Sequence, residues 1–216
     1  MKQYAIIGLG KFGASLATTL NDMGEEVLGI DSDLERVNEL SDKLTHIIQA
    51  DATDENVLKS LGIRNFDIVV ISMGADLEAT SIITMQCKEL GVKTVWAKVY
   101  NELHGRILLK VGADKIIIPE RDMGVRVARS LSSSSLLEYV ELSENYSLLE
   151  IKAIPIWYDK TLEELNFRSK YGANIMAIKN SEGEFNVSPL ARDVITEGDV
   201  LVVIGHKDSL KKMGKL

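Results

Sequence analysis

Short apolar runs alternate with longer segments of helical period along the first 131 residues of the chain. Continuous runs of Val and Ile, such as residues 68–71, are typical of strands buried on both faces of a parallel sheet. Glycines follow several helical segments and mark their ends. We therefore predict six strand–helix units, with strands near residues 5–7, 26–30, 46–49, 68–72, 94–99 and 115–118. The expected fold is a Rossmann-like α/β fold, in which helices cover both faces of a doubly wound parallel sheet.

Two helix boundaries in this part have specific signals. Ser32 followed by Glu35 resembles a capping box for a helix that extends to Lys43. The last helix, near residues 121–131, should present Met123, Val127 and Leu131 on one stripe.

The pattern changes after the run of four serines at residues 132–135. Serine side chains favour local bonds to the backbone, so this run indicates a linker or hinge, and we predict domains at 1–135 and 136–216. The second domain alternates strands (146–153, 174–179, 184–187 and 200–205) with short helices (161–165 and 207–213), and residues 180–183 form a hairpin turn. It is a small α+β module.

Composition narrows the class of protein. The net charge of −7 argues against a general affinity for nucleic acid or anionic lipid, both of which favour basic surfaces. Cys87 is the only cysteine, which excludes an intramolecular disulfide, and its apolar neighbours place it in the core. With no signal-peptide pattern and no apolar run of membrane-spanning length, we expect a soluble, cytoplasmic protein.

A glycine motif, Gly-Leu-Gly-Lys-Phe-Gly at residues 8–13, joins the first strand to the first helix. Gly8 permits a tight turn, Gly10 lets a phosphate approach the backbone, and Gly13 lets the helix lie close to the sheet. The helix N-terminus attracts anions. Asp31 ends the second strand, where a carboxylate can bind a ribose hydroxyl. The motif predicts a nucleotide site; an empty Rossmann turn, with Asp31 as a simple turn residue, is the alternative.

Further candidates lie where other strands end or where helices begin. Residues 51–53 would lie near an adenine, or Thr53 would serve only as a helix cap. Lys98 could face phosphates or lie in solvent, and Arg36 could lie against an adenine or pair with an acid. The complete set for the nucleotide is Gly8, Gly10, Lys11, Phe12, Gly13, Asp31, Ser32, Arg36, Asp51, Ala52, Thr53, Ser72, Met73, Gly74, Lys98 and Glu120.

Taken together, Asp31 and the segments 8–13, 51–53, 118–124, 166–172 and 199–205 resemble the cytosolic RCK subunits (regulators of potassium conductance) of bacterial Ktr/Trk potassium uptake systems. The resemblance covers nearly the whole chain. It implies a homo-oligomer, with dimers assembling into an octameric ring, on the cytoplasmic face of a membrane potassium-translocating subunit. It also implies that the ring binds ATP, ADP or NAD(H) and changes shape with the nucleotide, and that the 121–131 helix crosses onto a neighbouring subunit. An intrachain packing face would give the same stripe.

The resemblance implies roles for single residues. Lys11 would reach a γ-phosphate across a subunit interface, although relatives more often have arginine there, which weakens the expectation that ATP is preferred over ADP. Glu120 would help to hold Mg²⁺ or Ca²⁺ near the phosphates, or it is simply an acid at a helix start. The region of Arg168, Asn174, Ile175 and Pro189 would bind cyclic di-AMP, or these are ordinary surface residues.

The leading hypothesis is therefore a ligand-sensing gating subunit and not an enzyme. The alternative from another class is a small NAD-dependent oxidoreductase, which Asp31 permits. Hydride transfer needs a positioned acid or base beside a substrate pocket, and no such constellation appears in the sequence. His46, His104 and His206 lie far apart with no acid or cysteine at ligand spacing, so we expect them to be structural or surface residues. A redox-sensing repressor would need a basic helix-turn-helix segment, which we do not find.

Overall fold

The structure is a computed structural model, and it describes residues 2–74, 76–131 and 136–213. The chain divides into two compact units, Met1–Arg121 and Asp122–Leu216. The serine run expected to link two domains lies outside the described residues. Within the described ranges, no helix has both the length and the apolar character needed to cross a bilayer.

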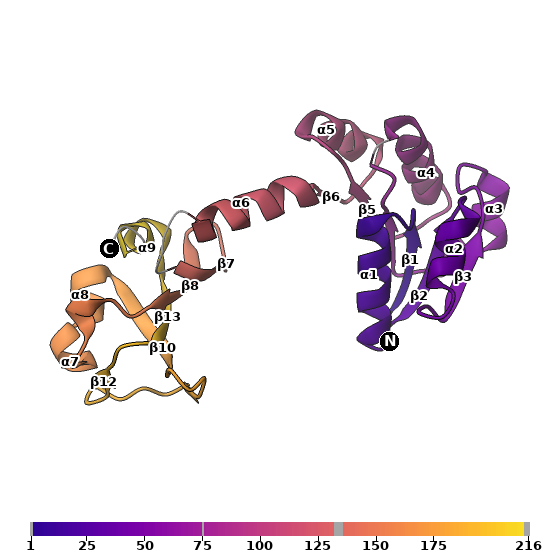
Figure 1. The fold of residues 1–216 in the computed structure, drawn as a ribbon. Helices are drawn as coiled ribbons and strands as arrows, with labels where there is room; N and C mark the ends of the chain where they lie inside the picture. The colour runs from indigo at the N-terminus through magenta and orange to yellow at the C-terminus, as the bar shows by residue number, and fades with distance from the viewer. Residues whose placement is uncertain (1, 75, 132–135, 214–216) are drawn as a thin grey trace. The chain divides into compact units, whose positions relative to one another are not determined.

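The first unit is built on a parallel sheet with strand order β3-β2-β1-β4-β5-β6 (Figure 1). Its strands are β1 (Gln3–Ile7), β2 (Glu26–Asp31), β3 (His46–Gln49), β4 (Ile68–Ile71), β5 (Val95–Lys98) and β6 (Lys115–Ile117). The strand order reverses between β1 and β4, whose residues Tyr4–Ile7 pair with Ile68–Ile71. This order is that of the doubly wound fold, so the predicted fold class is confirmed.

Helices cover both faces of this sheet because alternate strand residues point to opposite sides. They are α1 (Lys11–Asp22), α2 (Leu34–Leu40), α3 (Glu55–Ser60), the 3₁₀ turn η1 (Ile63–Asn65), α4 (Leu77–Glu89) and α5 (Glu102–Val111). Helix α6 (Pro119–Leu131) follows β6, and from Asp122 onward it belongs to the second unit. Ile6 packs with Ala17 of α1 and Leu40 of α2. Ile7 packs with Leu58 of α3 and with α4, which includes Cys87. Cys87 is fully buried, as predicted, and burial raises its pKa to about 12.

Three helix starts differ from the expectations. The N-cap of α2 is Asp33, whose carboxylate accepts the Glu35 N–H at 2.9 Å, so the Ser32 capping box is wrong and the helix ends at Leu40. The N-cap of α3 is Asp54 rather than Thr53. In both places an aspartate one residue further along accepts the orphan N–H group. Helix α6 begins earlier than expected, at Pro119, because proline is favoured at the first helical position.

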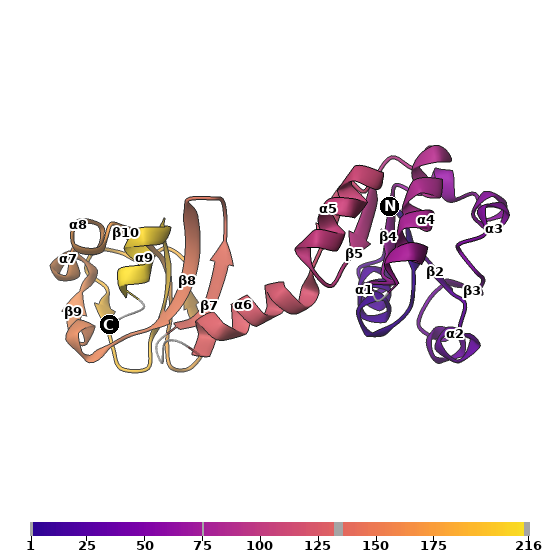
Figure 2. The same cartoon turned by 90° about the horizontal axis from the view of Figure 1, so that it is seen from above.

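The second unit contains an antiparallel sheet of order β11-β10-β13-β8-β7 and a two-stranded sheet of β12 and β9 (Figure 2). Its elements are β7 (Leu136–Glu141), β8 (Tyr146–Lys152), the 3₁₀ turn η2 (Pro155–Trp157), β9 (Lys160–Thr161), α7 (Leu162–Leu165), α8 (Phe167–Tyr171), β10 (Ala173–Lys179), β11 (Phe185–Asn186), β12 (Val194–Ile195), β13 (Val200–His206) and α9 (Lys207–Met213). The predicted α+β class is confirmed. Strands β10 and β11 form the predicted hairpin, with Gly183 at φ +91° in its turn.

Buried aromatic and aliphatic side chains hold the second unit together. Trp157 is fully buried and lies edge-on to Phe167, with 5.2 Å between ring centroids. Its indole N–H donates to the Tyr171 hydroxyl at 3.1 Å. This cluster fastens helix α8 against the sheet, and it positions the Arg168 segment described below.

Candidate functional site

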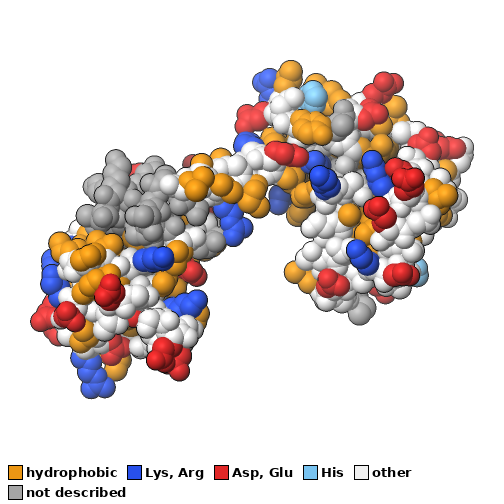
Figure 3. All heavy atoms as spheres, in the orientation of Figure 1, with side chains coloured by type: hydrophobic (Ala, Val, Ile, Leu, Met, Phe, Trp, Pro, Cys, Tyr) orange, Lys and Arg blue, Asp and Glu red, His pale blue; other side chains and the backbone are white. Residues whose placement is uncertain are grey.

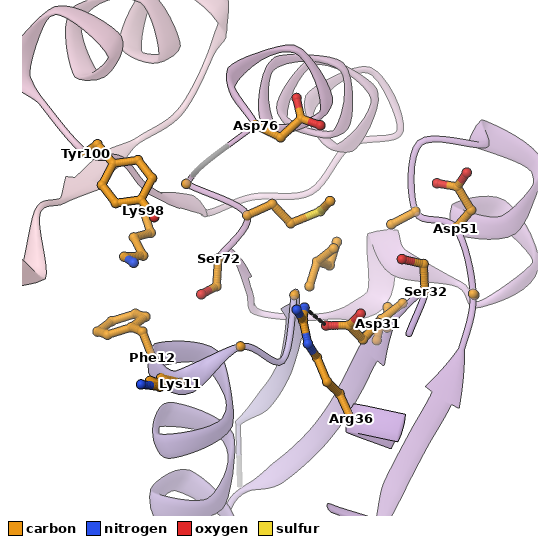
Figure 4. Close-up of a pocket in the computed structure, with 18 of the residues that line it drawn as sticks. Lys11, Phe12, Asp31, Ser32, Arg36, Asp51, Ser72, Asp76, Lys98 and Tyr100 are labelled. Carbon is orange, nitrogen blue, oxygen red and sulfur yellow. Dashed lines mark hydrogen bonds and ion pairs between the residues drawn. The ribbon is translucent and has the colours of Figure 1, made fainter. Parts of the chain in front are cut away.

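A cavity of about 480 Å³ lies at the carboxyl ends of β1 to β5 in the first unit (Figure 4). Ligands of open α/β sheets bind at such ends, where the strand order reverses, and this volume lies in the usual range for small-molecule sites. The lining residues are Ile7, Gly8, Gly10, Lys11, Phe12, Ile30, Asp31, Ser32, Arg36, Ala50, Asp51, Ala52, Ser72, Met73, Gly74, Asp76, Lys98, Tyr100 and Glu120.

The glycine loop forms the floor of this pocket. Gly8 has φ +91°, and its N–H donates to Ile30 O at 2.8 Å, which sets the turn between β1 and α1. A Cβ on Gly13 would lie 1.9 Å from Gly8 O, so this position requires glycine for close helix packing. A Cβ on Gly10 would meet nothing within 4 Å. The space above Gly10 is therefore open to a ligand atom.

Helix α1 starts at this open space without a side-chain cap. Gly10 is its N-cap, and no acidic residue lies in its first turn. The first N–H groups of the helix therefore lack a side-chain acceptor, and the positive end of the helix dipole faces the pocket. A phosphate at this point would accept those N–H groups. Lys11, the first helical residue, is exposed at the rim of the pocket and points its ammonium outward in Figure 4.

Asp31 combines a structural role with the expected ligand role. Its side chain is buried, and Oδ2 accepts the Leu9 N–H at 2.6 Å while Oδ1 accepts the Asp33 N–H at 2.9 Å. Arg36 Nη1 lies 3.3 Å from Oδ2. A carboxylate offers about four acceptor positions, so one remains for a ribose hydroxyl. The bond to Leu9, which ties the glycine loop to β2, was missed because sequence does not show which backbone group a carboxylate reaches.

The far side of the pocket suits an adenine. Ile7, Ile30, Ala50, Ala52 and Met73 supply apolar surface there. Beside them, the Thr53 hydroxyl and backbone N–H donate to Asp51 Oδ1 at 2.7 and 2.9 Å, and together they lower the pKa of Asp51. Thr53 itself does not line the pocket, because its side chain is directed to Asp51.

Lys98 and Glu120 form an ion pair at the opposite end. Their Nζ and Oε1 atoms are 3.0 Å apart, and the Lys98 side chain is only 12% exposed. Lys98 is therefore not the solvated lysine of the alternative interpretation. Its ammonium also lies 5.2 Å from the Tyr100 ring centroid and 5.9 Å from that of Phe12. The hydrogen bond from Lys98 lowers the pKa of Glu120.

The residues of one chain do not fit a divalent cation at Glu120. Its carboxylate is already neutralised by Lys98, and the described residues contain no group of three His, Cys, Asp or Glu side chains that could hold a metal. A site there would need oxygen ligands from outside this chain.

The second unit has a separate cavity of about 620 Å³ beside α8 and β10. Arg168, Asn174, Ile175 and Pro189, the residues expected at a second ligand, all line it. Arg168 Nε donates to Asn174 Oδ1 at 2.9 Å, which fixes the guanidinium at the cavity that Ile175 also lines. A guanidinium next to an apolar wall can hold a phosphate and a base.

The structure brings most of the sequence-predicted nucleotide residues to one pocket. Only Gly13 and Thr53 do not line it. Five lining residues were not predicted, namely Ile7, Ile30, Ala50, Asp76 and Tyr100. Most lie at or just beyond a strand end. Ala50 and Tyr100 follow the ends of β3 and β5 by one and two residues, so their position after a strand is the sequence signal that indicates them.

Comparison with known proteins identifies both units. The TrkA-N domain family matches residues 4–119, and the TrkA-C domain family matches residues 148–216. The chain is 46% identical over 211 residues to Ktr system potassium uptake protein A of Bacillus subtilis (strain 168), covering 98% of this chain and 95% of that protein. Protein C of the same system is 45% identical over 214 residues, covering 99% and 96%.

More distant relatives support the same family assignment. Ktr system potassium uptake protein A of Vibrio alginolyticus is 36% identical over 209 residues, covering 97% of this chain and 94% of that protein. The crystal structure of the GsuK RCK domain matches with a TM-score of 0.68 at 20% identity, covering all of this chain and 47% of that one, and it shows the same fold. The chain therefore belongs to the TrkA-N/TrkA-C family, as a KtrA-like RCK subunit related to the potassium uptake proteins of Ktr systems.

Proposed function

We propose that this chain is a nucleotide-sensing regulatory subunit that gates a membrane potassium-translocating subunit of the Ktr or Trk type. The observation that carries the proposal is the pocket at the β1–β4 reversal, where the open position at Gly10 lies beside the uncapped start of α1 and the buried carboxylate of Asp31. This combination supports ATP, ADP or NAD(H) as the ligand. Through its partner, the protein would act at the cytoplasmic face of the membrane.

Gating requires that the ligand bind two conformations with different affinity. Lys11 lines the pocket and is exposed. In the proposed assembly it would contact a γ-phosphate held by a second subunit, so ATP and ADP would differ in their effect. A divalent cation at Glu120 belongs to the proposal only as a bridge completed by nucleotide phosphates and that second subunit, since the described residues contain no group of three His, Cys, Asp or Glu side chains that could hold a metal.

Assembly into a ring is part of the proposal and is supported by helix α6. Met123, Val127 and Leu131 are 55%, 47% and 82% exposed. Apolar side chains gather along α6 in Figure 3, and the described residues of this chain do not cover them. An exposed apolar stripe of this kind is typical of an interface between subunits. We infer that it packs against a second copy, in dimers that assemble into an octameric ring.

Cyclic di-AMP is the proposed ligand of the second unit. Support comes from the 620 Å³ cavity with Arg168 and the apolar Ile175 and Pro189. A dinucleotide with two phosphates and two adenines offers both the charge and the apolar area that this cavity matches, and a dimer would complete it.

The rival function, a small NAD-dependent oxidoreductase, needs an acid or base free to exchange a proton with a substrate. Asp31 accepts three donors and Glu120 is paired with Lys98, so neither is free in this structure. Turnover of NADH with a small carbonyl substrate would favour the rival.

The test is a thermal-shift panel on the full chain with ATP, ADP, NAD, NADH and cyclic di-AMP, each with and without Mg²⁺ or Ca²⁺. The GsuK channel has been solved bound to NAD and bound to ADP, which is why both are in the panel. Ligand at 100 times its Kd stabilises a protein by about 2.7 kcal/mol, which gives a clear rise in Tm. An Asp31→Ala variant should lose the ATP and ADP response. A wild-type protein indifferent to every adenine compound contradicts the proposal.

A further inference from the structure

The ion pair of Lys98 and Glu120 lies inside the proposed nucleotide pocket. Lys98 is the last residue of β5, and Glu120 is the second residue of α6, so the pair joins the edge of the sheet to the first turn of that helix. The two side chains differ in exposure, at 12% for Lys98 and 56% for Glu120. Lys98 is thus held within the pocket, whereas Glu120 reaches it from the rim.

An ammonium this well buried needs an anionic or polar partner, because removal from water without one costs several kcal/mol. The ring faces of Tyr100 and Phe12 contribute cation–π attraction, but they carry no negative charge that would neutralise the ammonium. Glu120 is therefore the partner of Lys98 in the ligand-free chain. Its own exposure makes this a modest attraction that another anion can replace.

The same ammonium faces the place where phosphates would lie. Figure 4 shows Lys98, Phe12 and Ser72 near one another on the side of the pocket away from Asp51. Phe12 follows Lys11 in the first turn of α1. A polyphosphate that begins at Gly10 and extends along this side would come within reach of Lys98. It could not pair fully with Lys98 while Glu120 holds the ammonium.

We propose that Glu120 and the nucleotide polyphosphate compete for Lys98. In the ligand-free chain Glu120 binds the ammonium; when the nucleotide binds, its phosphates take Lys98 and the Lys98–Glu120 pair opens. Glu120 thereby lowers nucleotide affinity, and binding releases the ion pair that joins the first turn of α6 to β5. A separate ion pair joins Arg121 of that turn to Glu102 at 2.9 Å. This inference rests on the proposed nucleotide binding in the pocket, and it makes the Glu120 carboxylate a competitor of the nucleotide phosphates for Lys98.

The test measures ATP and ADP affinity by calorimetry on the full chain in buffer containing EDTA, so that divalent cations play no part. Glu120→Gln should bind both nucleotides more tightly, by roughly 1.4- to fivefold, the range expected when a competing half-exposed ion pair is removed. Lys98→Met should bind them more weakly. Glu120→Gln added to Lys98→Met should change nothing further, because there is no ammonium left to release.

Glu102→Gln is the matched control. It removes the carboxylate from the Arg121–Glu102 ion pair, and Glu102 does not line the pocket. This variant should leave the affinity for ATP and ADP unchanged. Thermal unfolding of each ligand-free variant verifies that it is folded.

Three results would overturn the competition. The first is a Glu120→Gln variant whose nucleotide affinity equals that of the wild type or is lower. The second is a gain in affinity that persists when Glu120→Gln is added to Lys98→Met, which would show that Glu120 repels the phosphates directly. An equal gain in Glu102→Gln would show a general effect of charge. If the wild type binds no adenine nucleotide at all, the proposed function itself is wrong and the competition falls with it.

Discussion

The three glycines after β1 are required for different physical reasons. At Gly13 a methyl group would collide with a backbone oxygen 1.9 Å away, whereas at Gly10 it would enter open space. Folding therefore constrains Gly13, whereas Gly10 would be constrained only by the phosphate that we propose lies above it. Sequence alone treats the two glycines as equal members of one motif.

Substitution of each glycine should separate stability from binding. Gly13→Ala should lower the free energy of unfolding by about 1–3 kcal/mol or more, because a backbone atom must move. Gly10→Ala should lower the free energy of unfolding by no more than about 1 kcal/mol, because alanine is a poorer N-cap residue than glycine. It should nevertheless weaken ATP binding strongly, because the added methyl group would occupy the proposed phosphate position. Denaturant unfolding and calorimetry measure the two effects. Full affinity in Gly10→Ala would contradict the phosphate site.

Lys11 is the residue that would distinguish ATP from ADP. Lys11→Ala should weaken ATP binding about tenfold more than ADP binding, because a charge-assisted bond to the γ-phosphate is lost. Titrations with both nucleotides measure the ratio. Lys43→Ala, an exposed lysine that does not line the pocket, is the control. Equal losses for both nucleotides would remove the γ-phosphate contact.

At the scale of elements, single carboxylates tie neighbouring segments together. Asp114 lies between α5 and β6, accepts the Val95 N–H at 2.7 Å and lies 3.0 Å from Lys88 Nζ on α4. Burial raises the pKa of Asp114, but the hydrogen bonds from Val95 and Lys88 outweigh it and the net pKa is lowered. The charged form of Asp114 therefore stabilises the packing of α4 beside β5.

The sign of this shift predicts a pH dependence. A folded pKa below the usual 3.8 means that the stabilisation is complete at neutral pH and is lost as the pH falls through the folded value. Asp114→Asn should therefore be less stable than wild type at pH 7, and the difference should shrink below about pH 4. Denaturant unfolding between pH 7 and pH 3 measures it. A difference that is constant with pH would show that charge plays no part.

At the scale of the whole molecule, the two units have separate cavities, and the proposed function predicts a separate ligand response for each. The nucleotide pocket is built from Rossmann strand ends, and the second cavity from α8 and β10. If the proposal is correct, each response should be removable on its own, because the two cavities share no lining residue.

Arg168→Ala should abolish the thermal shift with cyclic di-AMP and leave the ATP and ADP shifts unchanged, because Arg168 lines only the second cavity. Arg192→Ala, an exposed arginine of the same unit outside that cavity, should keep both responses. Loss of the ATP shift in Arg168→Ala would instead indicate that the substitution unfolds the protein.

Much of the fold could be predicted because it depends on local patterns. The runs of Val and Ile, the glycines at 8, 10 and 13 and the hairpin turn near Gly183 each have one favoured structure. The errors occurred where two neighbouring residues could do the same task, as with Ser32 and Asp33 at the start of α2. Strand β7 was not predicted, since its place at the edge of the second sheet depends on pairing with β8.

By itself, the sequence determined the fold class, the glycine loop and the strand-end positions that could face a ligand, because each follows from the spacing of apolar residues and glycines along the chain. Only the tertiary structure decided the partners of the charged groups. Asp31 holds the glycine loop through Leu9, and Lys98 is paired with Glu120 rather than solvated. These pairs join residues about twenty positions apart, and which of them meet depends on how strands and helices pack, which spacing does not encode.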